Sequence, residues 1–122
     1  MYGLTVRWSL ADAPKGTLKA LRTYVEDESF ARFAGLDGLR FKTWRARKGE
    51  WFECSYVFVS EEARAAFQKG FEEIAADSAG SKLIGSAPIT IEPCEIIAVV
   101  RGPAGFRSSS RFEHRNEQEP DN

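Results

Sequence analysis

The 122-residue sequence predicts one α+β domain in which strands and helices follow the order βαββαβ. Apolar residues alternate at every second position in four segments, which is typical of strands that place one face against a core. In two intervening segments they recur every three or four positions, which is typical of amphipathic helices. Glycines and prolines separate these segments and mark the loops between the elements.

The first third of the chain predicts a strand followed by a helix. Residues 2–10 alternate apolar and polar side chains, so we expect a strand there. From Thr17 the apolar positions take up helical spacing, and this helix should end near Glu28. Residues 29–38 contain two glycines and indicate a loop with at most a short turn of helix.

The middle of the chain predicts a hairpin and a second helix. Strands over residues 39–47 and 51–59 flank a tight turn at residues 48–50. Ser60 is a preferred N-cap residue, and the two glutamates after it are favourable at the positive end of a helix dipole. The helix predicted over residues 61–77 is strongly amphipathic.

The last predicted strand covers residues 89–100, after a loop with a turn of helix at residues 82–84. Pro93 cannot donate a backbone hydrogen bond, so this strand should lie at a sheet edge or bulge there. The domain is therefore predicted to cover residues 1–102. Residues 103–122 are polar and poor in aliphatic side chains, and we expect a mobile tail unless a partner orders it.

This succession of elements is the ferredoxin-like plan, a four-stranded antiparallel sheet of order 4-1-3-2 with both helices on one face. Cys54 belongs to the third strand and Cys94 to the fourth, so the first strand should lie between them. At ~4.8 Å per strand, the two thiols are too far apart to form a disulfide.

The predicted sheet is apolar on both faces, which helices on one side alone do not explain. The third strand places Phe52 and Phe58 on one face and Val57 and Val59 on the other. Antiparallel strands of this kind need cover on both faces, and the chain is too short to supply a second layer. We therefore expect a homodimer whose sheets pack face to face as a dimeric α+β barrel. A monomer with an apolar surface is the alternative.

Composition excludes several classes of function. Seventeen basic and eighteen acidic residues nearly cancel, so no strong field attracts nucleic acid or anionic lipid. No apolar run approaches the ~18 residues of a membrane span, and the first ten residues do not resemble a signal peptide. We therefore expect a cytoplasmic protein with free thiols. Two distant cysteines and one histidine, His114, do not predict a metal site.

The hairpin and the second helix resemble a known family. The segments "GLRFKTW" (38–44) and "SYVFVSEEARAAF" (55–67), with the closing "PITIEPCEIIAVVRG" (88–102), are similar to the YdhR-like monooxygenases. That family belongs to the dimeric α+β barrel superfamily, which includes the antibiotic-biosynthesis monooxygenases. The resemblance covers residues 1–102, and its pattern is matched here by Lys42, Trp44, Tyr56 and Phe58.

The resemblance implies a cofactor-independent monooxygenase that needs no metal, haem or flavin and acts on a small hydrophobic or aromatic molecule. Its pocket would lie between the sheet and the helices of each subunit. Such a reaction needs a cation or donor for the developing anion and a dry aromatic wall. The candidate catalytic residues are Lys42, as the cation, and Tyr56, as the donor. The candidate substrate-binding residues are Trp8, Trp44, Cys54 and Phe58.

Each candidate also has a purely structural interpretation. A strand lysine is often a solvated edge residue, strand aromatics usually fill a core, and Cys54 is a small buried hydrophobe. Arg7 paired with Glu53 or Glu92 on a neighbouring strand would only stabilise the sheet. The register that would place the candidates on one face cannot be derived from the turn alone.

The same sequence features also fit other functions. A dimeric carrier or sensor could use the same pocket without catalysis. An RNA-recognition motif shares the βαββαβ order, but the expected small residues between stacking aromatics are missing and the domain is not basic. The domain has no histidine, which argues against a histidine base and against haem degradation.

Overall fold

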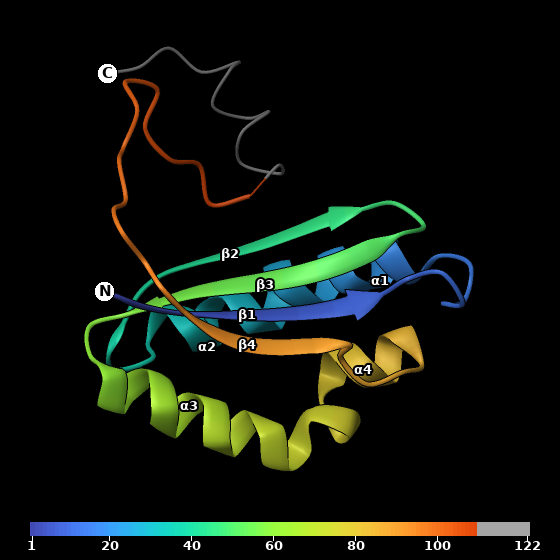
Figure 1. Cartoon of the computed structure of the whole chain (residues 1–122). Coiled ribbons are helices and arrows are strands. Elements are labelled where there is room, and N and C mark those ends of the chain that lie inside the picture. The colour runs from blue at the N-terminus through green and yellow to red at the C-terminus, as the bar shows by residue number, and fades with distance from the viewer. Residues whose placement is uncertain (110–122) are drawn as a thin grey trace.

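Four antiparallel strands form one sheet in the computed structural model, which describes residues 1–109 (Figure 1). The strand order is β2-β3-β1-β4, which confirms the predicted order and the ferredoxin-like plan. The sheet consists of β1 (Tyr2–Ser9), β2 (Leu39–Arg47), β3 (Trp51–Phe58) and β4 (Thr90–Glu95).

The helices pack on one face of the sheet and leave the other face open (Figure 1). The Ser60 side chain caps the longest helix by accepting a hydrogen bond from the backbone N–H of Ala63, as predicted. The helices are α1 (Thr17–Tyr24), α2 (Phe30–Ala34), α3 (Glu61–Ile74) and α4 (Ala79–Ile84). A short 3₁₀ turn, Ala75–Asp77, joins α3 to the loop before α4.

A π-helical turn, Val25–Ser29, joins α1 directly to α2, so the helical segment continues to Ala34 instead of ending near Glu28. The residues that face the sheet follow a spacing of four: Leu21, Val25, Ser29 and Phe33. In a regular α-helix this spacing drifts by about 40° per step. The wider π turn offsets the drift and keeps this row directed at the sheet. The row continues into the residues predicted to be a loop.

The register of β2, β3 and β1 decides which side chains share the helix-covered face. Lys42 lies opposite Tyr56 on β3, and Trp44 lies opposite Cys54. Cys54 in turn lies opposite Val6, which is completely buried. Because directly opposed residues point to the same face, Lys42, Trp44, Cys54 and Tyr56 all point toward the helices.

The last strand is shorter than the predicted 89–100. It ends at Glu95, opposite Tyr2. Two further bonds join Ile96 to Met1: Ile96 N donates to Met1 O at 2.9 Å, and the Met1 amino group donates to Ile96 O at 3.4 Å. The sheet partner β1 begins at Tyr2, so the chain beyond Ile96 has no strand to pair with and leaves the sheet (Figure 1). The prediction that Pro93 occupies an edge strand is confirmed.

Cys54 is buried and Cys94 is exposed, and both are free thiols, with β1 between their strands as predicted. Of the predicted tail, residues 103–109 form no helix or strand. The ring of Phe106 packs 5.6 Å from that of Phe41, and the Ser109 hydroxyl donates to Glu26 at 3.0 Å. The rest of the tail, 110–122, lies outside the described residues. Within residues 1–109, no helix is both long and apolar enough to cross a membrane.

Candidate functional site

A cavity of about 150 Å³ lies between the helices and the covered face of the sheet. Aromatic rings and other apolar side chains form most of its wall, and within residues 1–109 only Lys42 and Arg32 are charged lining residues. Five of the six candidate site residues line it: Trp8, Lys42, Trp44, Cys54 and Tyr56.

Lys42 is half-buried, and its amine is surrounded by aromatic groups. Its Nζ lies 3.2 Å from the ring centre of Phe33, 4.3 Å from that of Tyr56 and 4.5 Å from that of Trp44. It also donates a hydrogen bond to the Tyr56 hydroxyl at 3.2 Å. A strand lysine that only served to solubilise an edge would instead extend into water.

The pKa of Lys42 falls from its ordinary 10.5 to about 7, chiefly because of burial. Cys54 opposes the shift, and repulsion from Arg32 adds to it. Removing an ammonium group from water disfavours its charged form, and neighbouring aromatic faces replace that hydration only in part. Near neutral pH, a large fraction of the molecules therefore carries Lys42 as a free amine. A free amine can accept a proton, and the ammonium it becomes can stabilise a neighbouring anion.

Tyr56 and Cys54 are held in their neutral forms. Burial raises the pKa of the Tyr56 hydroxyl, and burial also raises the pKa of the Cys54 thiol. Tyr56 packs between the rings of Phe58 and Phe67, with ring centres 6.0 Å and 4.8 Å away. A fixed, protonated phenol is a hydrogen-bond donor, whereas a buried protonated thiol is a poor nucleophile.

Two tryptophans on the helix-covered face of the sheet, Trp8 and Trp44, form part of the wall. Trp44 lies edge-on to Phe33 at 6.0 Å and is half-buried. Trp8 is buried against Phe52 at 5.6 Å, and its indole N–H donates to the Ser81 hydroxyl at 3.0 Å. That bond satisfies the only polar atom of the Trp8 side chain and fixes the ring in place.

Phe58 is not among the cavity-lining residues. Its side chain is only 1% exposed and packs in the core beside Tyr56 and Phe67, 5.6 Å from the Phe67 ring. It therefore supports Tyr56 from behind rather than forming the wall.

The helices supply lining residues that the sequence interpretation missed, chiefly Arg32, Phe33 and Ser29. Ser29 and Phe33 are buried, and Arg32 is exposed. The signal that could have found two of them is the spacing of four from Leu21 through Phe33, which continues through the predicted loop.

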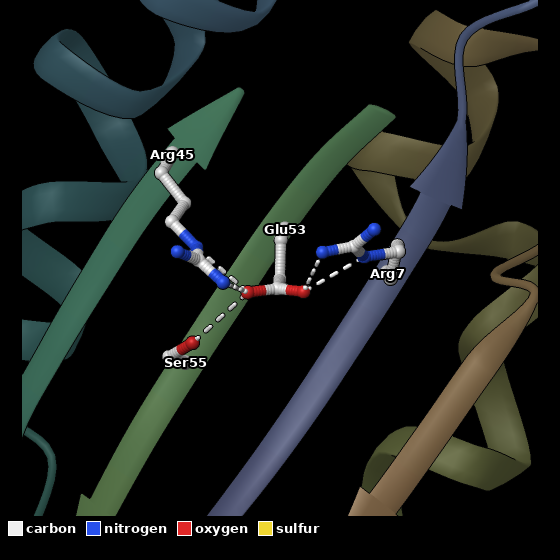
Figure 2. A network of polar contacts seen from close by, with 4 residues as sticks. All are labelled: Arg7, Arg45, Glu53 and Ser55. Carbon is white, nitrogen blue, oxygen red and sulfur yellow. Dashed lines mark hydrogen bonds and ion pairs between the residues drawn. The ribbon is translucent and has the colours of Figure 1, made fainter. Parts of the chain in front are cut away.

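A second polar cluster lies on the open face of the sheet (Figure 2). Glu53, only 3% exposed, accepts hydrogen bonds from Arg7 on β1 and Arg45 on β2, both at 2.8 Å. Burial alone would raise the pKa of the Glu53 carboxyl, but the bonds from Arg45 and Arg7 outweigh it and lower that pKa. Ser55 makes a longer contact at 3.4 Å. The predicted Arg7–Glu53 pair is confirmed, and this cluster connects three strands.

Chemically, the cavity offers a proton acceptor, a hydrogen-bond donor and an aromatic wall in one sheltered space. These groups suit binding and deprotonation of a small aromatic molecule that bears a hydroxyl group. No group of three or more His, Cys, Asp and Glu side chains in residues 1–109 is arranged to hold a metal ion.

Comparison with known proteins places the fold. Neither the family models nor the curated proteins that were compared match this sequence. Among solved structures, a protein of unknown function from Nitrosomonas europaea is 24% identical with a TM-score of 0.62, covering 85% of this chain and 95% of its own. The ActVA-Orf6 monooxygenase of Streptomyces coelicolor, in complex with nanaomycin D, is 17% identical with a TM-score of 0.60, covering 83% and 91%.

A third similar structure is a dimeric ferredoxin-like protein from an uncultured marine organism, 10% identical with a TM-score of 0.53, covering 81% of this chain and 96% of its own. All three likenesses extend over most of both chains. Together they show that this protein has a ferredoxin-like α+β fold.

Proposed function

We propose that this protein is a cofactor-independent monooxygenase of the antibiotic-biosynthesis-monooxygenase-like superfamily, closest in kind to its YdhR-like members. The observation that carries the proposal is the Lys42 amine, held against three aromatic rings and bonded to Tyr56 inside a cavity. The likeness to a monooxygenase structure supports the reaction class, and the quoted sequence segments support the family.

The substrate in this proposal is a small electron-rich aromatic compound such as a quinol. One atom of dioxygen enters the ring and the other leaves as water. The four electrons that reduce dioxygen all come from the substrate, which leaves as a hydroxylated quinone. The reaction therefore needs no external reductant.

Lys42 and Tyr56 have separate roles. The neutral Lys42 amine accepts the proton of the substrate hydroxyl, and the resulting ammonium stabilises the aromatic anion that donates an electron to dioxygen. Tyr56, which stays protonated, donates a hydrogen bond to the developing negative charge. Trp8, Trp44 and Cys54 exclude water from the reacting ring.

The working unit in this proposal is a homodimer built as an α+β barrel. Three large apolar side chains that follow β4 remain exposed in one copy: Ile97 (86%), Val99 (45%) and Val100 (88%). Such a patch is unusual on a monomer and fits cover by a second copy. The dimeric state of one similar structure supports the same arrangement. Free thiols, one of them exposed, suit the reducing cytoplasm.

Oxygen uptake with single-ring and fused-ring quinols tests the proposal. Lys42→Met should lower the enzyme-dependent rate about a hundredfold or more, because it removes the proton acceptor. Lys69→Met, at an exposed lysine on α3, is the matched control and should keep the wild-type rate. Equal rates in wild-type protein and Lys42→Met, or no uptake above the spontaneous rate, would overturn it. Ligand binding without uptake would favour the non-catalytic carrier or sensor.

A further inference from the structure

The volume of the cavity limits the size of its ligand. Apolar cavities of about 150 Å³ accommodate one benzene ring. The cavity that Lys42 and Tyr56 line together is also about 150 Å³, and buried rings of Phe33, Phe52 and Tyr56 form part of its wall. Interiors this densely packed do not widen freely, so a fused two-ring or three-ring compound would have to displace these side chains.

The charges of the cavity limit the chemistry of that ligand. Among the described residues, the two charged residues that line the cavity, Arg32 and Lys42, are cationic, and no Asp or Glu side chain lines it. Arg32 is exposed, so its guanidinium marks the rim, whereas Lys42 lies farther inside. Within residues 1–109, no carboxylate forms an ion pair with Arg32.

The two cations are near neighbours. The Arg32 guanidinium carbon lies 5.0 Å from the ring centre of Phe33, and Lys42 Nζ lies 3.2 Å from the same centre. Their repulsion is large enough to lower the pKa of Lys42. A ligand with a negative group at the rim would relieve this repulsion and gain a charge-assisted hydrogen bond from the guanidinium.

We propose that the cavity takes a single aromatic ring that carries a hydroxyl group and, at the rim, a carboxylate or similar anion held by Arg32. The position of the hydroxyl, beside Lys42 and Tyr56, rests on the proposed function. The size and charge of the ligand rest on the cavity itself. Arg32 is thus a specificity-determining residue that selects hydroxylated aromatic acids over neutral phenols.

Calorimetric titration without oxygen tests whether the cavity prefers a ligand with a negative charge. The probes are 4-hydroxybenzoate and its neutral counterpart phenol, measured with wild-type protein, Arg32→Gln and the control Arg40→Gln, which changes an exposed arginine outside the cavity wall. Wild-type protein and Arg40→Gln should bind 4-hydroxybenzoate about tenfold or more tightly than phenol. In Arg32→Gln the two affinities should come within about twofold, because only the acid loses a partner. Circular dichroism confirms that each variant is folded.

The size is tested with 6-hydroxy-2-naphthoate, which keeps both functional groups and adds a ring. It should bind wild-type protein about tenfold or more weakly than 4-hydroxybenzoate. Four results would each overturn the proposal. Wild-type protein could bind phenol and 4-hydroxybenzoate equally, or bind no probe at all. The affinity for 4-hydroxybenzoate could fall equally in Arg32→Gln and Arg40→Gln, or the naphthoate could bind more tightly than 4-hydroxybenzoate.

These outcomes are separate from those of the oxygen-uptake experiment. Selective binding of the acid without oxygen uptake would leave this inference standing and overturn the monooxygenase proposal. Oxygen uptake with fused-ring quinols and no selectivity for the acid would leave the monooxygenase proposal standing and overturn this inference.

Discussion

The surroundings of Lys42 differ strongly from those of an ordinary strand lysine. Its amine exchanges water for three aromatic faces and one phenolic oxygen, and its pKa falls to about 7. A structural role alone does not explain this arrangement, because a charged group that is costly to bury lowers the stability of the fold. Residues that reduce stability in this way are often found at functional sites.

The stability of the protein should therefore depend on pH through Lys42. Between pH 7 and 10.5 the unfolded chain keeps this amine protonated while the native protein does not, so the free energy of unfolding rises with pH in this window. Lys42→Met lacks that contribution. It should be more stable than wild-type protein at pH 7, with a difference that shrinks toward pH 10. Urea unfolding at several pH values measures this, with Lys69→Met as control, and a difference that does not change with pH contradicts the assignment.

The candidate site was predictable from sequence where strands supply it. Side chains alternate strictly in a strand, so the parity of Lys42 with Trp44, and of Cys54 with Tyr56, could be derived from their numbers alone. Arg32 and Phe33 could not be found in that way. The spacing of four from Leu21 indicates Phe33 only if the helix continues past Glu28, and that continuation depends on a π turn.

At the scale of elements, the Glu53 cluster is the polar connection across the sheet. It joins the edge strand β2 to β3 and the central strand β1 through two arginines (Figure 2). Both arginines also lie over the ring of Trp51, with guanidinium carbons 4.3 Å and 5.3 Å from its centre. Because the strands on either side of β3 are held by one carboxylate, removing its charge affects both pairings.

Glu53→Gln should lower the free energy of unfolding at pH 7 by about 2 kcal/mol, since a buried carboxylate bonded to two arginines is replaced by a neutral amide. Because the pKa of Glu53 is depressed, its contribution is present above the unfolded value of 4.5 and is lost as pH falls through the native value. Chemical denaturation should thus show a difference in the free energy of unfolding between wild-type protein and Glu53→Gln that disappears at acid pH. Ser55→Ala, which removes only the 3.4 Å contact, is the control. If this difference persists unchanged at low pH, the charge of Glu53 is not the cause of the stabilisation.

The order of the elements was predictable, but the extent of two of them was not. The βαββαβ order follows from local patterns in each segment. The end of β4 instead depends on where its partner β1 begins, which is a property of the tertiary structure. The first helical segment likewise extends to Ala34 because its row of sheet-facing residues continues, although residues 29–38 indicate a loop locally.

At the scale of the whole molecule, the open sheet face and the segment after β4 are the surfaces on which the proposed homodimer depends. Light scattering should report about twice the 13.7 kDa chain mass for the wild-type protein. The double variant Ile97→Glu, Val100→Glu should shift this toward the monomer, because burying two carboxylates in an apolar interface is costly. Ile89→Glu is the control, since Ile89 is also exposed (64%) but precedes β4. A wild-type mass of one chain, or a dimer that the double variant does not weaken, would contradict the proposed barrel.

Mass spectrometry of products formed under ¹⁸O₂ tests the proposed chemistry most directly. The probe is 2,5-dihydroxybenzoate, a single-ring quinol that carries a carboxylate, incubated with chelator-treated protein and with Lys42→Met. We expect one ¹⁸O atom in the quinone product of the wild-type protein, the second atom in water, and no product above the spontaneous background with Lys42→Met. Incorporation of both atoms, incorporation of none, or the same labelled product from both proteins would contradict a monooxygenase that acts through Lys42.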